Sequence, residues 1–135
     1  MNTILLIPTS EGVGLTSACL GMVYALDCKG IKAGFLKPFS QITDTSLDRT
    51  TSLYRHLFQQ QTVEPIAYER LTQLVALGES DELLEGAVAL HRQIAADHKV
   101  IIVEGLVPNG QDHFAIEVNA ALAQALNAQV VLIST

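Results

Sequence analysis

The sequence predicts an α/β fold, a three-layer parallel sheet with helices on both faces, and two observations favour it. Four apolar runs, each of four residues and mostly β-branched or leucine, cover residues 4–7, 33–36, 100–103 and 130–133. Short apolar runs without polar alternation are typical of strands buried on both faces. The segments between the runs carry helical periodicity, and a strand-helix-strand crossover requires parallel pairing.

The helices follow in chain order. Residues 15–29 repeat apolar positions at three- and four-residue steps, and Gly30 supplies a stop. Further helices are expected over residues 46–58, 68–77 and 114–126, and over a longer segment that Ser80 caps, with Asp81 and Glu82 in its first turn. The fourth apolar run is followed by no helix, which leaves one sheet face poorly covered. We therefore expect residues 1–135 to be a single, partial domain, truncated after the fourth strand and part of a longer chain.

Composition bounds the function. The 135 residues are 49% hydrophobic without tryptophan, which fits one domain with an aliphatic core. A net charge of −6 with eight Lys and Arg residues argues against partners such as nucleic acid or an anionic membrane. Cys19 and Cys28 lie nine residues apart in one predicted helix, too far apart for a disulfide. Together with the lack of an export signal, this predicts a cytoplasmic protein.

The loop between the first strand and the first helix resembles a phosphate loop. Residues 8–17 keep the second glycine of the pattern G-x-x-x-x-G-K-[ST] as Gly14 and its hydroxyl as Thr16, but place Leu15 where the lysine is expected. Losing that lysine removes a charge-assisted contact of roughly 1.5 to 3 kcal/mol. The loop therefore predicts a P-loop-like anion cradle that is doubtful for phosphoryl transfer, and a tight strand-to-helix turn is the alternative. The candidate loop residues for nucleotide or anion binding are Thr9, Gly12, Gly14, Thr16 and Ser17.

Charged residues follow the second and third strands. Lys37 directly follows the second run and Glu104 directly follows the third, and parallel strands bring their carboxyl ends to one ligand crevice. Lys37 is thus a further anion-binding candidate, while Thr16, Asp48 and Glu104 are the candidate magnesium ligands. The alternatives are a solvated Lys37 and an Asp48 that only favours a helix dipole. The four histidines lie on different predicted elements, and no catalytic residue is assigned.

Several segments together resemble the N-terminal domain of the long form of bacterial phosphate acetyltransferase, and they span nearly the whole chain. They are Ile7-Pro8-Thr9, Val13-Gly14-Leu15-Thr16-Ser17, Lys37-Pro38, Asp48-Arg49-Thr50-Thr51, Val103-Glu104-Gly105-Leu106-Val107-Pro108 and Leu126-Asn127-Ala128. That domain is similar to dethiobiotin synthetase and to cobyrinic acid amide synthases, which use ATP and magnesium. The resemblance implies a dethiobiotin synthetase-like P-loop fold, with Thr16 and Glu104 at the magnesium position and Lys37 near phosphate.

The resemblance also implies a function. Its parent enzyme interconverts acetyl-CoA and phosphate with acetyl phosphate and CoA in a C-terminal catalytic domain, and the N-terminal part supports assembly and the response to metabolites. We therefore expect a noncatalytic regulatory domain, with the rest of its own polypeptide and further copies as partners. ATP, NADH, pyruvate or phosphoenolpyruvate is the expected effector. An ATP-dependent carboxylate-amine ligase of the dethiobiotin synthetase type is the alternative, and a partition-type ATPase is a third.

Overall fold

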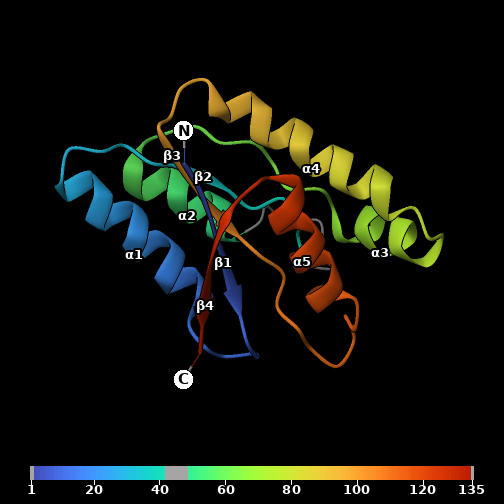
Figure 1. The fold of residues 1–135 in the computed structure, drawn as a ribbon. Helices are drawn as coiled ribbons and strands as arrows, with labels where there is room; N and C mark the ends of the chain where they lie inside the picture. Colours follow the sequence, from blue (N-terminus) through green and yellow to red (C-terminus); the bar gives the residue numbers. More distant parts are fainter. Residues whose placement is uncertain (1, 42–48, 135) are drawn as a thin grey trace.

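A computed structural model describes residues 2–41 and 49–134 of the chain. These residues form four strands and five helices, with three of the helices in succession between β2 and β3 (Figure 1). In chain order they are β1 (Asn2–Pro8), α1 (Leu15–Cys28), β2 (Gly34–Leu36), α2 (Arg49–Phe58), α3 (Tyr68–Ala76), α4 (Ser80–Ala95), β3 (Val100–Glu104), α5 (Ala115–Ala125) and β4 (Gln129–Ile133). All four predicted strands are confirmed, and each differs from its predicted bounds by at most two residues at either end.

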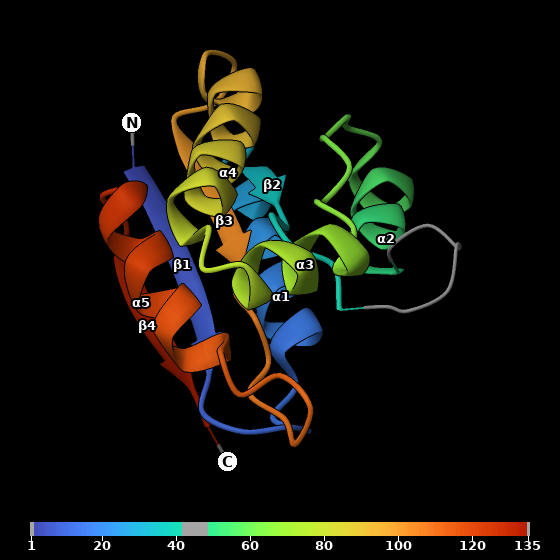
Figure 2. The ribbon, with the colours of Figure 1, turned by 90° about the vertical axis from the view of Figure 1, so that its right-hand side faces the viewer.

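The strands form one parallel sheet in the order β2-β3-β1-β4. Every connection between successive strands contains at least one helix, as a parallel sheet requires. In the view of Figure 2 the helices lie on either side of the strands. The parallel α/β fold class predicted from the apolar runs is therefore confirmed.

Two hydrophobic clusters, one on each face of the sheet, hold the layers together. Alternation along the strands separates them, because Leu5 belongs to one cluster while its neighbour Leu6 belongs to the other. The first cluster packs the sheet against α3, α4 and α5, and the second packs it against α1 and α2. Both clusters are mainly aliphatic, with Phe39 in the first and Phe35 and Tyr54 in the second.

The outer strand β4 is the least covered part of the sheet. Among the residues that the structure describes, it pairs with β1 along one edge only, and Val130, Val131 and Leu132 expose 45%, 37% and 66% of their surfaces. Neighbouring residues of a strand point to opposite faces, so both faces of β4 are open. The sequence-based expectation of a poorly covered sheet is met at this strand.

The ends of the helices bring one correction. Ser80 does not cap α4, because the helix begins at Ser80 and its N-cap position is Glu79, whose side chain makes no capping hydrogen bond. Ser80 thus lies one residue inside the helix, although Asp81 and Glu82 lie in the first turn as predicted. The stop at Gly30 agrees with its φ of 80°, a left-handed conformation that glycine adopts without strain. Within the described residues, the helices are too short or too polar to cross a membrane.

Candidate functional site

The loop between β1 and α1 borders a cavity at the carboxyl ends of the strands. Gly14 occupies the N-cap position of α1 with a φ of 80°, a left-handed conformation that favours glycine. Because glycine has no side chain, Gly14 cannot cap the first-turn amides of α1. The cavity has a volume of about 270 Å³ and is lined by Pro8, Ser10, Gly12, Val13, Gly14, Leu15, Thr16, Ser17, Lys37, Glu104 and Val107. Uncapped amides and the positive end of a helix dipole give this cavity the chemistry of an anion site.

The structure brings together five of the six predicted anion-binding residues. Four come from the loop and the start of α1, and Lys37 comes from the end of β2. Thr9 does not line the cavity, because it is directed to the neighbouring strand. Its backbone N–H and its hydroxyl both donate to the carbonyl oxygen of Ile133 at the end of β4, at 2.9 and 3.3 Å. In this structure Thr9 therefore ties the loop to β4.

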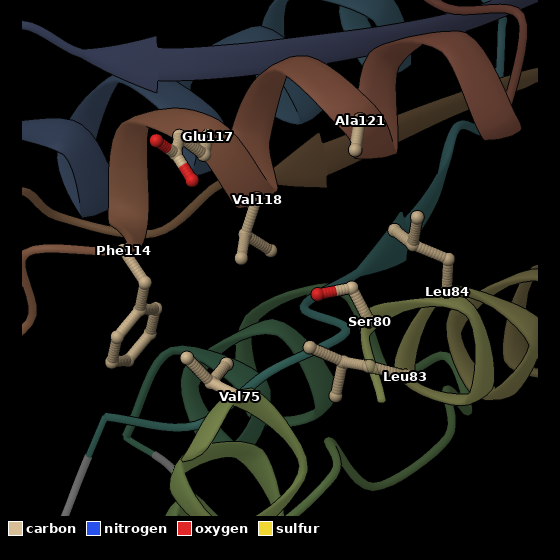
Figure 3. Close-up of a pocket in the computed structure, with 8 residues that line it drawn as sticks. All are labelled: Val75, Ser80, Leu83, Leu84, Phe114, Glu117, Val118 and Ala121. Carbon is tan, nitrogen blue, oxygen red and sulfur yellow. The ribbon is translucent and has the colours of Figure 1, made fainter. Parts of the chain in front are cut away.

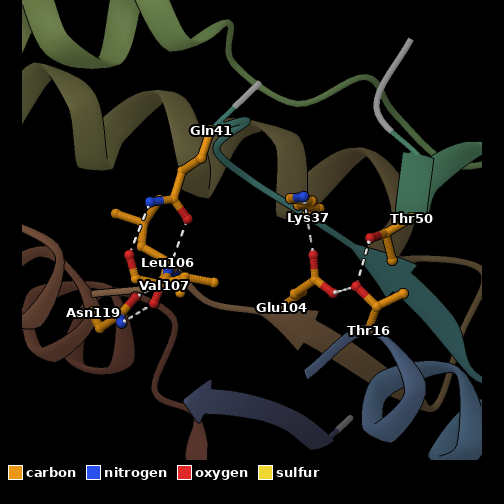
Figure 4. A network of polar contacts seen from close by, with 8 residues as sticks. All are labelled: Thr16, Lys37, Gln41, Thr50, Glu104, Leu106, Val107 and Asn119. Atoms are coloured by element: carbon orange, nitrogen blue, oxygen red, sulfur yellow. Dashed lines mark hydrogen bonds and ion pairs between the residues drawn. The ribbon is translucent and has the colours of Figure 1, made fainter. Parts of the chain in front are cut away.

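A buried ion pair forms one wall of the cavity. Lys37 Nζ lies 3.1 Å from Glu104 Oε2, and their side chains are only 13% and 2% exposed. Thr16 Oγ1 donates to Glu104 Oε1 at 3.4 Å and lies 3.2 Å from the hydroxyl of the buried Thr50 (Figure 4). Lys37 and Glu104 are the charged residues among those that line the cavity. The wall thus carries both signs of charge within a few ångströms.

The surroundings of Glu104 have a low effective dielectric constant. Burial raises the pKa of the Cys19 thiol well above its usual value, and the charge of Glu104 raises it further while Lys37 opposes this effect. Cys19 therefore stays a protonated thiol beneath the ion pair. In such surroundings an ion pair is screened weakly, so the Lys37 ammonium and the Glu104 carboxylate attract each other strongly.

Leu15 occupies the loop position at which a phosphate loop carries lysine. Its side chain is 8% exposed and packs in the same hydrophobic cluster as Leu6 and Cys19. An apolar group at this position can stabilise the start of α1 against the sheet, but it offers no charge to a bound phosphate. Lys37 therefore supplies the positive charge on the cavity wall.

The candidate magnesium ligands are only partly within the described residues. Thr16 and Glu104 are in hydrogen-bond contact, and hydroxyl and carboxylate oxygens are ligands that suit this cation. Asp48 lies outside the described residues. Among residues 2–41 and 49–134, no group of three or more His, Cys, Asp or Glu side chains is arranged to hold a metal ion.

Sequence reasoning missed a set of polar residues beside the cavity. Gln41 bonds both backbone groups of Val107, and Asn119 bonds both backbone groups of Leu106. Asp112 is 2% exposed and accepts hydrogen bonds from Gln41 and from the hydroxyl of Tyr68. Gln41 follows the second apolar run by a few residues, a position that is also typical of solvated loops, and Asn119 lies inside a predicted helix, so little in the sequence signals this set.

A second cavity lies on the other side of the sheet and has a different chemistry. It has a volume of about 330 Å³ between α3, α4 and α5 (Figure 3). Its lining is mostly apolar, with Ser80 and Glu117 as polar members beside Val75, Leu83, Leu84, Phe114, Val118 and Ala121. Without a positive side chain in its lining, this cavity is poorly suited to a phosphate or carboxylate.

Comparison with known proteins agrees with this architecture. A family model described as an AAA domain matches residues 2–135. The chain is 70% identical over 135 residues to phosphate acetyltransferase of Acinetobacter baylyi, covering 100% of this chain and 19% of that protein. It is 42% identical to the enzyme of that name from Haemophilus influenzae, covering 98% of this chain and 19% of the relative. For Escherichia coli phosphate acetyltransferase the identity is 35%, over 96% of this chain and 19% of the relative.

These relatives are much longer than the chain, which spans about a fifth of their length, and the match lies in their N-terminal part. The family match covers all four strands, the loop after β1 and the Lys37–Glu104 pair. The chain therefore belongs to the AAA domain family and is homologous to the N-terminal part of phosphate acetyltransferases.

Proposed function

We propose that this chain is the noncatalytic regulatory and assembly domain of a phosphate acetyltransferase, and that its loop cavity binds an anionic metabolite. The observation that carries the proposal is the leucine in the loop. Leu15 is packed into the core at the position of the phosphate-loop lysine, so the cavity keeps its helix amides and loses a contact needed for phosphoryl transfer. Such a cavity favours binding over ATP turnover.

Under this proposal, acetyl transfer takes place in a part of the polypeptide outside residues 1–135. The relatives are about five times as long as the chain, which leaves ample length for a catalytic domain. The uncovered β4 supports a related proposal, that residues 1–135 are part of a larger P-loop-like domain. Parallel strands are normally covered on both faces, so another segment of the same polypeptide is the natural cover for β4.

The remaining parts of the proposal concern partners and location. We infer a cytoplasmic homo-oligomer whose partners are the remainder of its own polypeptide, further copies and a small metabolite, without nucleic acid or membrane. The net charge of −6 supports the exclusion of both polyanionic partners. Light scattering of the complete polypeptide measures the assembly directly, and a monomeric mass would contradict that part.

The effector is tested by calorimetric titration of the complete polypeptide. ATP, NADH, pyruvate and phosphoenolpyruvate are the ligands to titrate, because each carries phosphate or carboxylate oxygens. We expect at least one to bind, and Lys37→Met to weaken its binding about tenfold or more because a charge-assisted contact is lost. Lys32→Met removes an equal charge from an exposed residue and should leave the affinity unchanged. Binding of none of the four, or equal loss in both variants, contradicts a loop effector site.

The noncatalytic part has its own test. The complete polypeptide is assayed for magnesium-dependent ATP hydrolysis beside Thr16→Ala, which removes the hydroxyl next to Glu104. We expect no hydrolysis above background in either protein. Hydrolysis that Thr16→Ala abolishes would show catalysis at this loop and overturn the proposal.

An ATP-dependent carboxylate-amine ligase is the second candidate, favoured by the convergence of Thr16, Lys37 and Glu104 on one cavity. Under this alternative, restoring the loop lysine by Leu15→Lys should raise the affinity for ATP. No gain in ATP affinity in a variant that still folds counts against the ligase.

A further inference from the structure

The segment that follows β2 cannot continue its ladder with β3. Lys37 directly follows β2 and pairs with Glu104, the last residue of β3, but the next residue, Pro38, has no backbone N–H to donate. The main chain turns instead to Ile66, whose N–H donates to the carbonyl of Pro38 at 2.8 Å and whose carbonyl accepts from Ser40 at 2.9 Å. The Gly105 N–H still bonds the Leu6 carbonyl of β1, so it is on the side of β2 that the backbone beyond Glu104 needs other partners.

Two side-chain amides supply these partners. Gln41 Oε1 accepts from the Val107 N–H at 2.7 Å, and Gln41 Nε2 donates to the Val107 carbonyl at 3.0 Å. Asn119 of α5 makes the same two bonds with Leu106: its Oδ1 accepts from the Leu106 N–H at 2.8 Å, and its Nδ2 donates to the Leu106 carbonyl at 2.9 Å (Figure 4). Each amide bonds the main chain as the peptide group of an adjacent strand would.

Asp112 fixes the orientation of the Gln41 amide. A carboxylate only accepts hydrogen bonds, so the 2.8 Å contact with Asp112 directs the Gln41 NH₂ group toward it and the Gln41 oxygen toward the Val107 N–H. Tyr68 donates to the other carboxylate oxygen at 2.7 Å and holds Asp112 in place. Asp112 is 2% exposed, so water competes poorly for these bonds.

We propose that Gln41 is a positioning residue for the loop cavity. It joins the segment that carries Lys37 to the segment that carries Glu104, beyond the point where the strands cease to pair. Val107, which it holds, is itself part of the cavity lining. The segment that carries Lys37 thereby stays fixed against the part of the cavity wall that Val107 forms, and an anionic metabolite meets a preformed site. This role rests on the proposed function of the cavity.

The first test follows the Val107 amide directly. Hydrogen exchange is measured in the complete polypeptide for Gln41→Ala and Gln41→Glu, with Gln124→Glu as the control that adds the same charge on the exposed side of α5. In both Gln41 variants at neutral pH we expect exchange at Val107 to be about 3- to 10-fold faster than in the wild type. Gln41→Ala removes the acceptor of the Val107 N–H, whereas Gln41→Glu loses the NH₂ donor and is repelled by Asp112, which draws the side chain away from Val107. Leu106, which Asn119 holds, should keep its exchange rate. Unchanged exchange at Val107 in both variants overturns the proposal.

Acidification separates the two Gln41 variants. Gln41→Glu at neutral pH places a second carboxylate beside Asp112, and protonation restores an O–H donor for this contact. Relative to the wild type at the same pH, protection of Val107 should recover in Gln41→Glu near pH 5 and stay low in Gln41→Ala. A loss of side-chain volume alone would not respond to pH in this way. Equal behaviour of the two variants at both pH values contradicts the orientation by Asp112.

The second test measures ligand affinity with ATP, NADH, pyruvate and phosphoenolpyruvate as probes. For a probe that binds the wild type, we expect an affinity about 3- to 10-fold lower in both Gln41 variants and unchanged in Gln124→Glu. Wild-type affinity in Gln41 variants whose Val107 exchange is accelerated overturns the positioning role and leaves the proposed function standing. Binding of no probe to the wild type overturns the proposed function, and the positioning role falls with it.

Discussion

Replacing Glu104 by glutamine tests whether the Lys37–Glu104 pair stabilises the chain. Their charged atoms lie 3.1 Å apart with side chains 13% and 2% exposed. At an effective dielectric constant of 20, two unit charges at this distance attract by about 5 kcal/mol, which desolvation largely offsets. Breaking a buried pair by removing one partner typically costs about 3 to 5 kcal/mol. Since Lys37 retains some contact with water, we expect Glu104→Gln to lower the free energy of unfolding by about 2 to 4 kcal/mol.

Urea unfolding of Glu104→Gln, Lys37→Met and the double variant is the assay. Glutamine keeps an acceptor for Thr16 and so isolates the charge. The double variant should lose less than the sum of the two single losses, because neither charge is then left without the other. Glu85→Gln, at an exposed position of α4, is the control and should change stability by less than about 0.5 kcal/mol. A coupling energy below about 0.5 kcal/mol would refute the reasoning.

Four further predictions concern two glycines and two buried titratable side chains. Gly105→Ala should lower the free energy of unfolding by about 1 to 3 kcal/mol, because the added Cβ would lie 2.9 Å from Asn119 Oδ1 and 3.0 Å from a main-chain oxygen of β1. Gly21→Ala in α1, where a Cβ meets nothing within 4 Å, should raise the free energy of unfolding by about 0.5 to 1 kcal/mol. Equal changes in the stability of the two alanine variants, measured by urea unfolding, would contradict this contrast. Burial lowers the pKa of His91 from 6.5, so the unfolded chain binds more protons and the free energy of unfolding should fall as the pH drops below about 6.5. The same dependence of stability on pH in His91→Gln would contradict this prediction. Burial raises the pKa of Tyr54 from 10.0 to about 12. The contribution of the protonated phenol to the free energy of unfolding is therefore complete below pH 10 and is lost as the pH rises from 10 to 12. In an alkaline titration, the stability of Tyr54→Phe should fall less steeply with pH than that of the wild type.

The strands and most helices could be predicted because their signals are local. Burial on both faces selects continuous apolar runs, and the crossovers between them fix the parallel direction of the sheet. Gly30 marked a helix end correctly, since it adopts a positive φ in the structure. The error at Ser80 has an equally local cause, because Glu79 and Ser80 are adjacent and the helix start differs from the predicted one by a single residue.

The charged part of the site was predictable and the amide part was not. Lys37 and Glu104 directly follow two apolar runs, so their meeting follows from the parallel alignment of strand ends. Gln41 bonds Val107 across 66 residues of sequence, and this contact depends on where Pro38 turns the chain. Thr9 was matched to a phosphate-loop pattern by spacing alone, whereas its hydrogen bonds depend on the position of β4. Long-range geometry of this kind leaves no trace in local periodicity.

The bare edge of β4 has a practical consequence for work on the 135-residue chain. Unpaired backbone groups flanked by Val130 and Leu132 form a template on which another chain can add a strand, and this tendency grows with concentration. Dimers or aggregates of the 135-residue chain can therefore arise from this edge and are not by themselves evidence of a physiological interface. Solubility, stability and molecular mass are best compared at several protein concentrations, with a Leu132→Lys variant that disfavours association through the edge of β4.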